Sequence, residues 1–291
     1  MTDVQVAELQ RDGAVAGGGG AGGAGAVPTA GFIAGTLAAY EHALLLYRRT
    51  WRGSIFANFA QPVLFLLAMG VGLGSYVDKG AGAGALGGVT YLQFLAPALL
   101  VSTVMQGSVF EATFPVLAGF HWVRRYHAMY ATPLSPYAIA AAQLAWIATR
   151  ATLVGAIFCA VAFAFGAAAT PAMILVVPIG TLTGVAFAAP IAAYMATQRD
   201  TNSFNQIWRF GITPLFLFSG TFFPIERLPD FLQPVAWILP LWHGVDLGRA
   251  LAMGTLGEQP LLHLAHLGIL VIAAAIGIAA TFRSFRRKLE A

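Results

Sequence analysis

Six long apolar runs, separated by short polar or proline-rich breaks, dominate the pattern of this chain. Each run approaches the roughly 20 residues that a helix needs to cross a bilayer. Transmembrane strands would instead show weaker alternating segments of about 10 residues. The pattern predicts an all-α integral membrane protein whose transmembrane domain covers residues 32–291. Its six transmembrane helices are expected at roughly 54–74, 91–115, 137–166, 172–196, 206–222 and 261–282.

The stretch before the first run has the period of an amphipathic helix. Leu37, Tyr40, Leu44, Tyr47 and Trp51 recur at helical spacing, while arginines occupy other positions on the wheel. A basic helix with an aromatic stripe is suited to the headgroup layer, so we predict an N-terminal amphipathic interfacial helix. The alternative is a simple extension of the first span. Residues 1–31 are rich in glycine and alanine and are predicted to form a disordered tail.

The segment at 217–250, between the fifth and sixth runs, is both apolar and broken. It contains several aromatic residues and four prolines, at Pro224, Pro229, Pro234 and Pro240. Proline interrupts regular helix, and irregular backbone at membrane depth needs protein or a water-filled cavity to cover it. We therefore predict a broken helical hairpin that dips into the outer membrane face. An ordinary amphipathic external loop is the alternative.

Composition and charge agree with a membrane protein. The chain is 58% hydrophobic and 10% charged, with a mean hydropathy of +0.74, whereas soluble chains carry about 25% charged residues. In a soluble protein the net charge of +4 would suggest nucleic acid. Here the basic residues flank the apolar runs, so topology explains them and no nucleic-acid partner is expected.

The distribution of basic residues predicts the orientation. With the N-terminus inside, twelve basic residues lie in the cytoplasm and only Lys79, Arg227 and Arg249 lie outside. Such an excess is the positive-inside bias. Both termini are therefore expected in the cytoplasm.

The segment at 119–136, GFHWVRRYHAMYATPLSP, is the main predicted cytoplasmic feature. Trp122, Tyr126, Met129 and Tyr130 share one face of a predicted helix over 121–130, and arginines occupy another. Aromatic side chains on a short helix could anchor it in a partner's groove. A helix that lies on the lipid surface is the alternative.

Two charged residues, Glu111 and Arg150, lie within apolar runs and are candidate functional residues by that position. At 1.5 Å per residue, Glu111 should lie about 10 Å above the inner end of its helix and Arg150 about 22 Å above the start of its own. This difference of about 12 Å argues against a direct ion pair. Glu111 is expected to meet the amphipathic helix or the cytoplasmic loop, and Arg150 a polar cavity or a subunit interface.

Signatures of enzyme chemistry are absent from the sequence. The only lysines are Lys79, followed by Gly80, and Lys288, followed by Leu289, so no P-loop exists and ATP must be bound by another polypeptide. His263 and His266 could share a helix face, but no carboxylate or cysteine is expected beside them, so no metal is predicted. No G-x-S-x-G motif is present. We expect a protein that is not an enzyme and has no cofactor of its own.

Several motifs resemble the permeases of type-2 ABC exporters, in particular those of nodulation-factor and lipooligosaccharide exporters. These are QFLAPALL at 93–100, VFEATF at 109–114, RRYHAMYATPLSP at 124–136 and, in the hairpin, SGTFFP followed by LP-x-x-H-x-x-x-x-x-R. The hairpin motifs contain Gly220, Pro224, Pro240, His243 and Arg249.

The resemblance implies a fold, partners and a location. It implies six helices per subunit, two permease subunits around one path (a homodimer is expected), and a separate P-loop ABC ATPase. The protein would be a multi-pass component of a bacterial-type cytoplasmic membrane, in contact with its lipids. The residues implied in coupling to the ATPase are His121, Trp122, Arg124, Arg125, Tyr126 and Tyr130.

The function that we expect is ATP-driven export of a lipid-linked, glycolipid or amphipathic cargo. A drug or antibiotic efflux permease of the same family is the first alternative. A membrane-embedded lipid-modifying enzyme would need convergent acid–base residues, for which Glu111 is too isolated. A passive channel would need polar pore-lining repeats, which the sequence lacks.

Overall fold

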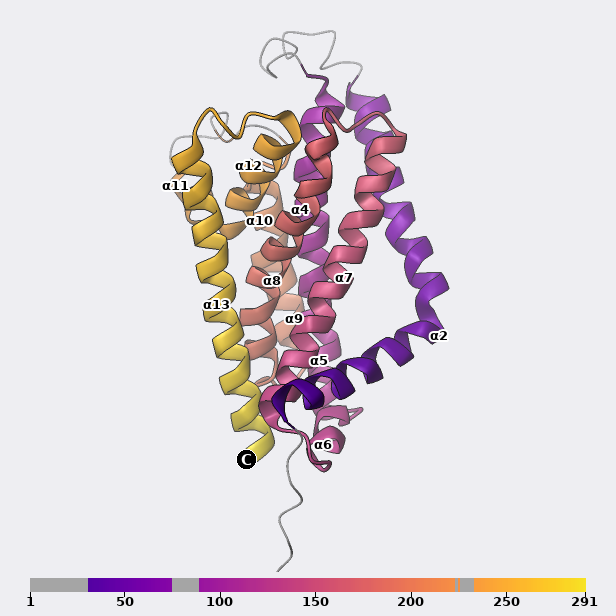
Figure 1. The fold of residues 1–291 in the computed structure, drawn as a ribbon, viewed down its shortest axis with the longest axis vertical. Coiled ribbons are helices and arrows are strands. Elements are labelled where there is room, and N and C mark those ends of the chain that lie inside the picture. The colour runs from indigo at the N-terminus through magenta and orange to yellow at the C-terminus, as the bar shows by residue number, and fades with distance from the viewer. Residues whose placement is uncertain (1–30, 75–88, 223–224, 226–232) are drawn as a thin grey trace, which may run out of the picture.

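The computed structural model describes residues 31–74, 89–222, 225 and 233–291, and its regular elements in these ranges are all helical (Figure 1). Residues 1–30 of the predicted tail, most of the loop at 78–89, and Pro224 lie outside the described residues. The elements are α2 (Phe32–Leu66), the π-helix η1 (Leu67–Gly74), α4 (Tyr91–Ala112), α5 (Phe114–His121), α6 (Arg125–Tyr130), α7 (Pro136–Ala164), the 3-10 helix η3 (Pro171–Leu175), α8 (Val176–Met195), α9 (Asn202–Gln206), the π-helix η4 (Ile207–Ile212), α10 (Thr213–Phe218), α11 (Gln233–Ile238), α12 (Pro240–Met253) and α13 (Pro260–Glu290).

Four helical segments of the described chain are long and apolar enough to cross a membrane. They are Tyr91–His121, Pro136–Ala164, Pro171–Met195 and Pro260–Glu290, and they match the second, third, fourth and sixth predicted spans. The all-helical class is confirmed. The first and fifth predicted spans correspond to α2 with η1 and to α9, η4 and α10, which are not among the four. Six spans therefore stay a prediction.

The predicted amphipathic stretch and the first part of the first predicted span belong to one helix, α2, which bends sharply (Figure 1). The N-terminal part of α2 crosses the bundle at the end that holds α6 and the C-terminus. We define residues 32–47 as the α2 arm. It is attached to α7, because the Tyr40 hydroxyl lies 3.0 Å from that of Thr149 and the Tyr47 ring packs 5.5 Å from that of Trp146. The amphipathic stretch is therefore continuous in sequence with the first predicted span, but it runs in a different direction.

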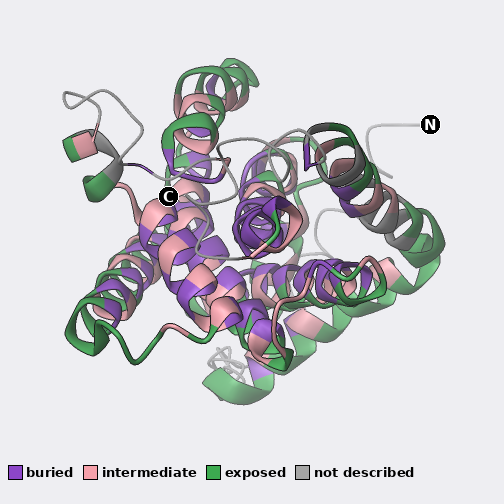
Figure 2. Ribbon diagram, turned by 90° about the horizontal axis from the view of Figure 1, so that it is seen from above, coloured by how far each residue is buried: buried purple, intermediate pink, exposed green. Residues whose placement is uncertain are grey.

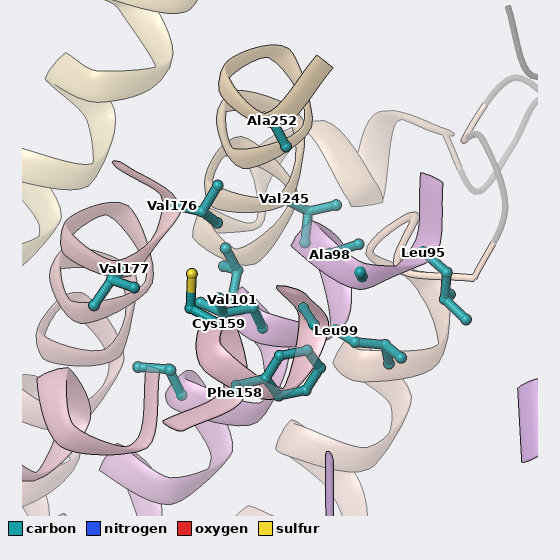
Figure 3. Packing of buried hydrophobic residues seen from close by; sticks show 14 of the residues in the cluster. Leu95, Ala98, Leu99, Val101, Phe158, Cys159, Val176, Val177, Val245 and Ala252 are labelled. Atoms are coloured by element: carbon teal, nitrogen blue, oxygen red, sulfur yellow. The ribbon is translucent and has the colours of Figure 1, made fainter. Parts of the chain in front are cut away.

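Helix α4 is the enclosed element of the bundle. In its segment, 78% of the most apolar stretch is buried inside the protein, against 28% for α13. Figure 2 shows buried residues gathered in the middle and exposed residues on the outer faces. Around α4 the core brings together Val101 and residues from three other helices, Phe158 of α7, Val176 of α8 and Val245 of α12 (Figure 3).

Glycines allow α8 to approach α4 closely, and α12 to approach both α8 and α4. Each helix has a G-x-x-x-G spacing, Gly180 with Gly184 in α8 and Gly244 with Gly248 in α12. A Cβ atom added to Gly184 would overlap the side chain of Ser108 in α4, and one added to Gly244 would overlap that of Thr183. Membrane helices associate through packing of this kind, because burial from lipid supplies little hydrophobic driving force.

Replacing Gly184 or Gly244 with alanine should therefore destabilise the protein by about 1–3 kcal/mol, the usual cost of overpacking. The matched control is Gly268→Ala in α13, where an added Cβ meets nothing within 4 Å. The control should be neutral or slightly stabilising, since alanine favours helix. Thermal unfolding in detergent measures all three. Equal losses at all three positions would contradict close packing as the cause.

Candidate functional site

The loop between α4 and α7 is two short helices and not one. Helix α5 ends at His121 and α6 begins at Arg125, and between them Arg124 has a φ of 53°. A side chain in this left-handed region is uncommon and costs about 1 kcal/mol or more, so the surrounding contacts must hold the turn. The prediction of one helix over 121–130 is therefore wrong, and so is the single face that was to carry Trp122 with Tyr126.

Tyr126 points into the protein. Its side chain is 2% exposed, and its ring packs 4.6 Å from that of Phe120 and 5.2 Å from that of Phe285 at the end of α13. Its hydroxyl donates a hydrogen bond to Gln143 Oε1 over 2.9 Å. Burial raises its pKa against the opposing effect of Arg125, so the hydroxyl remains a donor. Tyr126 anchors the loop to its own bundle, so its ring is not exposed for a partner's groove, and its part in coupling stays a prediction.

Arg125 is also directed inward. Its Nη2 donates to the Tyr126 hydroxyl (2.7 Å), to Gln143 Oε1 (3.1 Å) and to the backbone oxygen of Pro115 (3.3 Å). The Tyr126 ring lies against Gly119, where an added Cβ would collide with it. The hydrophobic pattern did not single out Gln143, although it is one of the few polar residues in the apolar run of α7.

Of the predicted coupling residues, Trp122, Arg124 and Tyr130 are exposed, and so is the nearby His127. We call them the loop surface. Trp122 is 55% exposed, although its ring lies 5.7 Å from that of Phe114. Burial and the nearby Arg124 lower the pKa of His127, so Arg124 supplies the positive charge of this surface at neutral pH. The loop surface thus combines two aromatic side chains with one cation.

His121 fixes the other side of the loop. Its Nε2 donates a hydrogen bond of 2.6 Å to the backbone oxygen of Gln198, in the turn between α8 and α9. The loop is therefore attached to α7 through Gln143 and to the end of α8 through His121. These two attachments leave the loop surface facing away from the bundle.

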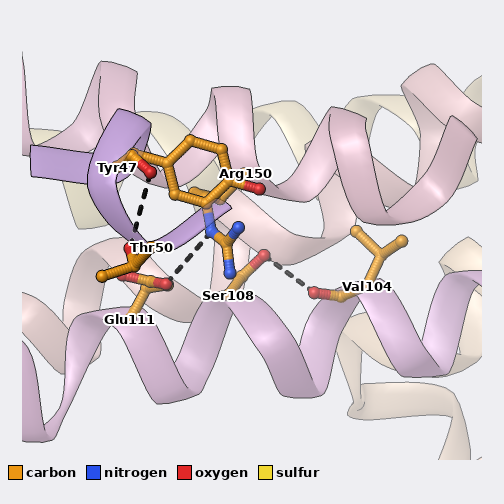
Figure 4. Close-up of polar contacts among 6 residues, drawn as sticks. All are labelled: Tyr47, Thr50, Val104, Ser108, Glu111 and Arg150. Carbon is orange, nitrogen blue, oxygen red and sulfur yellow. Dashed lines mark hydrogen bonds and ion pairs between the residues drawn. The ribbon is translucent and has the colours of Figure 1, made fainter. Parts of the chain in front are cut away.

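Glu111 and Arg150 form an ion pair, contrary to the prediction from helix rise. Arg150 Nε lies 3.2 Å from Glu111 Oε1, and the guanidinium stacks 4.7 Å above the Tyr47 ring of α2 (Figure 4). The prediction took Ala118 and Ser135 to be at equal height. Arg125 instead bonds to both Pro115 and Gln143 and so places those two residues side by side. Glu111 is then roughly 6 Å and Arg150 roughly 10 Å above a common level, which an arginine side chain can span.

The hairpin residues cover broken backbone at the opposite end. Arg249 Nη2 donates to the backbone oxygens of Gly220 (2.7 Å) and Thr221 (2.9 Å), and Nε donates to that of Phe94 in α4 (3.3 Å). Gly220 has a φ of 77°, which glycine adopts without strain. Thr221 also bonds through its hydroxyl to Ser102 of α4 at 2.8 Å. The backbone carbonyl groups of Gly220 and Thr221, just after α10, thus have donors within the protein, as an apolar medium requires.

Pro240 opens α12 at its first position, where a missing N–H costs nothing, and His243 lies buried three residues later. The His243 ring packs 4.8 Å from that of His266 of α13. His266 Nδ1 lies 3.2 Å from Asp246 Oδ2, so the expectation that no carboxylate accompanies the histidines is wrong. Asp246 is far from His266 in sequence and meets it only because α12 packs against α13. Within the described residues no group of three possible metal ligands occurs.

Comparison with known proteins identifies the family to which these helices and motifs belong. Residues 36–253 match the family model described as "ABC-2 type transporter". The chain belongs to the ABC-2 type transporter family. The match runs from the α2 arm through α12 and so includes the loop surface, the ion pair and the hairpin. The chain is therefore a membrane component of an ABC transporter and not itself an enzyme.

Similarity to individual proteins indicates the subfamily to which the chain is related. Nodulation protein J from Rhizobium leguminosarum bv. viciae is 31% identical over 256 residues, covering 87% of this chain and 94% of the relative. Nodulation protein J from Rhizobium meliloti (strain 1021) is 30% identical over 254 residues, covering 87% and 93%. The protein of that name from Bradyrhizobium diazoefficiens is 29% identical with the same coverage. The resemblance predicted from the motifs, to an ABC-2 permease of the nodulation exporter type, is confirmed.

The ion pair can be tested by removing one charge or both. Glu111→Gln or Arg150→Met alone leaves an unpaired charge in apolar surroundings and should destabilise the protein by up to about 3 kcal/mol, less than for a fully buried pair. The double variant leaves no charge and should recover most of that loss. Thermal unfolding in detergent gives the three values. Additive losses in the double variant would show that the two side chains do not interact.

Proposed function

We propose that this permease exports a lipid-linked, glycolipid or otherwise amphipathic cargo, with a separate ABC ATPase and a second permease subunit, most simply another copy of itself. In this proposal each subunit has six spans, and both termini lie in the cytoplasm of a bacterial-type cell. The Nodulation protein J relatives support export of this kind. The lack of a P-loop in the sequence supports an ATPase on another polypeptide.

The observation that carries the proposal is the loop surface at the end of the enclosed helix α4. Trp122, Arg124, His127 and Tyr130 lie at the same end of the bundle as the C-terminus and the start of α2 (Figure 1). Exposed tryptophan, tyrosine and arginine are the side chains that most often dominate protein–protein binding energy. A soluble ATPase approaching from the cytoplasm would meet this surface first.

The contacts behind the loop surface explain how its movement would reach the spans. Helix α5 follows α4 after one residue, Thr113, so a displacement of the loop acts directly on α4. Tyr126 and Arg125 hold the loop to α7, and His121 holds it to the end of α8. Closure of the ATPases on ATP would thus move α4, α7 and α8 together and rearrange the two permease subunits about the cargo path.

The class of cargo is tested by comparing lipids and small molecules inside and outside cells with and without the protein. Loss of the protein should leave an amphipathic or glycolipid product inside the cells. Increased sensitivity to a hydrophobic drug without any retained lipid would favour the efflux alternative. The carboxylate of Glu111 is paired with Arg150, which argues against the alternative of a lipid-modifying enzyme that uses Glu111 as an acid or base.

Coupling is tested by Trp122→Ala, with Trp237→Ala as the matched control, because Trp237 is similarly exposed (49%) at the opposite end. Loss of a buried aromatic anchor costs about 2 kcal/mol or more, roughly a thirtyfold loss of affinity. Trp122→Ala should therefore weaken co-purification of the partner ATPase, and Trp237→Ala should not. Arg124→Ala should be milder and more sensitive to salt. Tyr126→Phe should lower thermal stability instead. Wild-type ATPase binding by Trp122→Ala would refute the docking surface.

The orientation is tested with reporters that are active on only one side of the membrane. A reporter fused after Ala291 should be cytoplasmic, because the last helix ends in Arg283, Arg286, Arg287 and Lys288. A reporter inserted at Gly82 should be external. Reporters on the same side would require an even number of spans between the two positions and would overturn the six-span arrangement.

A further inference from the structure

A groove of about 780 Å³ lies between the α2 arm and the loop that carries α5 and α6. This volume is in the range of roughly 300–1,000 Å³ that small-molecule sites occupy. Its walls are mainly apolar, formed by Ala38 and Leu46 on the arm and by Pro115, Val123, Met129 and Leu134 on the loop. None of the roles described above for the loop surface and the interhelical contacts uses this groove.

The polar side chains of the groove give it a positive character. His42 lines it from the arm, Arg125 and Thr132 line it from the loop, and none of its lining residues is acidic. Arg125 donates its hydrogen bonds to neutral acceptors, and among the described residues no carboxylate lies within ion-pair distance of it. A charge that is half-buried without an opposite charge favours an anion from outside the chain.

The arm places the groove at the level of lipid headgroups. It exposes apolar side chains such as Leu37 and Leu44, and it is followed directly by the exposed Arg48 and Arg49. A helix with these two kinds of side chain lies in the membrane interface. In the proposed orientation this is the cytoplasmic leaflet, whose anionic lipids attract basic side chains and enter basic pockets between helices.

We propose that the groove binds one anionic phospholipid of the cytoplasmic leaflet. The acyl chain lies along the apolar walls, and the phosphate lies near Arg125 and His42. The lipid bridges the α2 arm and the loop, so it stiffens the connection between the membrane interface and the loop surface. An ATPase on the loop surface would approach the exposed side of Trp122 and Arg124, whereas the groove lies on the side of the loop that faces the arm.

The test uses the full-length protein purified from nanodiscs that contain equal parts of phosphatidylglycerol and phosphatidylcholine, with retained lipid counted by native mass spectrometry. Wild-type protein should retain about one phosphatidylglycerol per chain in preference to phosphatidylcholine. Ala128→Trp fills the groove, since Ala128 is exposed and lines it. Ala131→Trp, three residues further on at an exposed position outside the lining, is the matched control. Only the first should lose the retained lipid.

A second pair of variants tests the charge without adding bulk. His42→Glu places a carboxylate opposite Arg125 and should weaken phosphatidylglycerol retention about fivefold or more, a larger loss than the uncharged His42→Gln causes. Thermal unfolding identifies any variant that fails to fold. The Ala128 and Ala131 variants test the space in the groove, and the His42 variants test its charge, so a folding defect in one pair leaves the other pair informative.

Retention of phosphatidylglycerol by both Ala128→Trp and His42→Glu would overturn the proposal, and so would equal retention of phosphatidylcholine by wild-type protein. Loss of ATPase co-purification in Ala128→Trp with unchanged lipid retention would assign the groove to the ATPase and would also overturn it. A failure of coupling is seen separately, because Trp122→Ala should leave lipid retention unchanged.

Discussion

The enclosure of α4 by α7, α8 and α12 is the constraint on which the rest of the structure depends. Every residue at 94–105 is buried, so the neighbouring helices must approach closely, and glycines at Gly180, Gly184, Gly244 and Gly248 permit it. The same helix supplies partners at each end. It accepts a hydrogen bond from Arg249 of the hairpin and carries Glu111, the partner of Arg150. Helix α4 therefore connects the broken backbone at one end to the loop at the other.

Some side chains of the loop at the end of α4 hold it to the bundle, and others are exposed to solvent. Tyr126 and Arg125 face inward because Gln143 of α7 offers an acceptor in an otherwise apolar setting, and a buried hydroxyl or guanidinium without a partner would be costly. The turn at Arg124 then directs Trp122 and Tyr130 outward. A short helix with one face fixed in this way presents a rigid surface, which loses less conformational entropy on binding than a mobile loop would.

The α2 arm, α4 and α7 meet at one level through Tyr47, Glu111 and Arg150 (Figure 4). A charged pair in apolar surroundings contributes little net stability, because desolvation offsets its attraction. The ion pair instead fixes the positions of α2, α4 and α7 relative to one another along the bundle axis. The groove at the arm begins close to this junction, with Leu46 adjacent to Tyr47. The arm, the loop and the enclosed helix thus form one connected unit.

The sequence by itself determined the helical class, four of the spans and the family. These follow from local properties of the sequence. The length of each apolar run predicts a span, residues such as Ser135 before Pro136 mark where a helix begins, and the family motifs are contiguous in the chain. Only the tertiary structure decided that Tyr126 faces inward, that Glu111 reaches Arg150, and that Asp246 accompanies His266. Each of these depends on the relative height and rotation of two helices. Both are set by side-chain packing between segments far apart in the chain, about which hydrophobic periodicity within one segment carries no information.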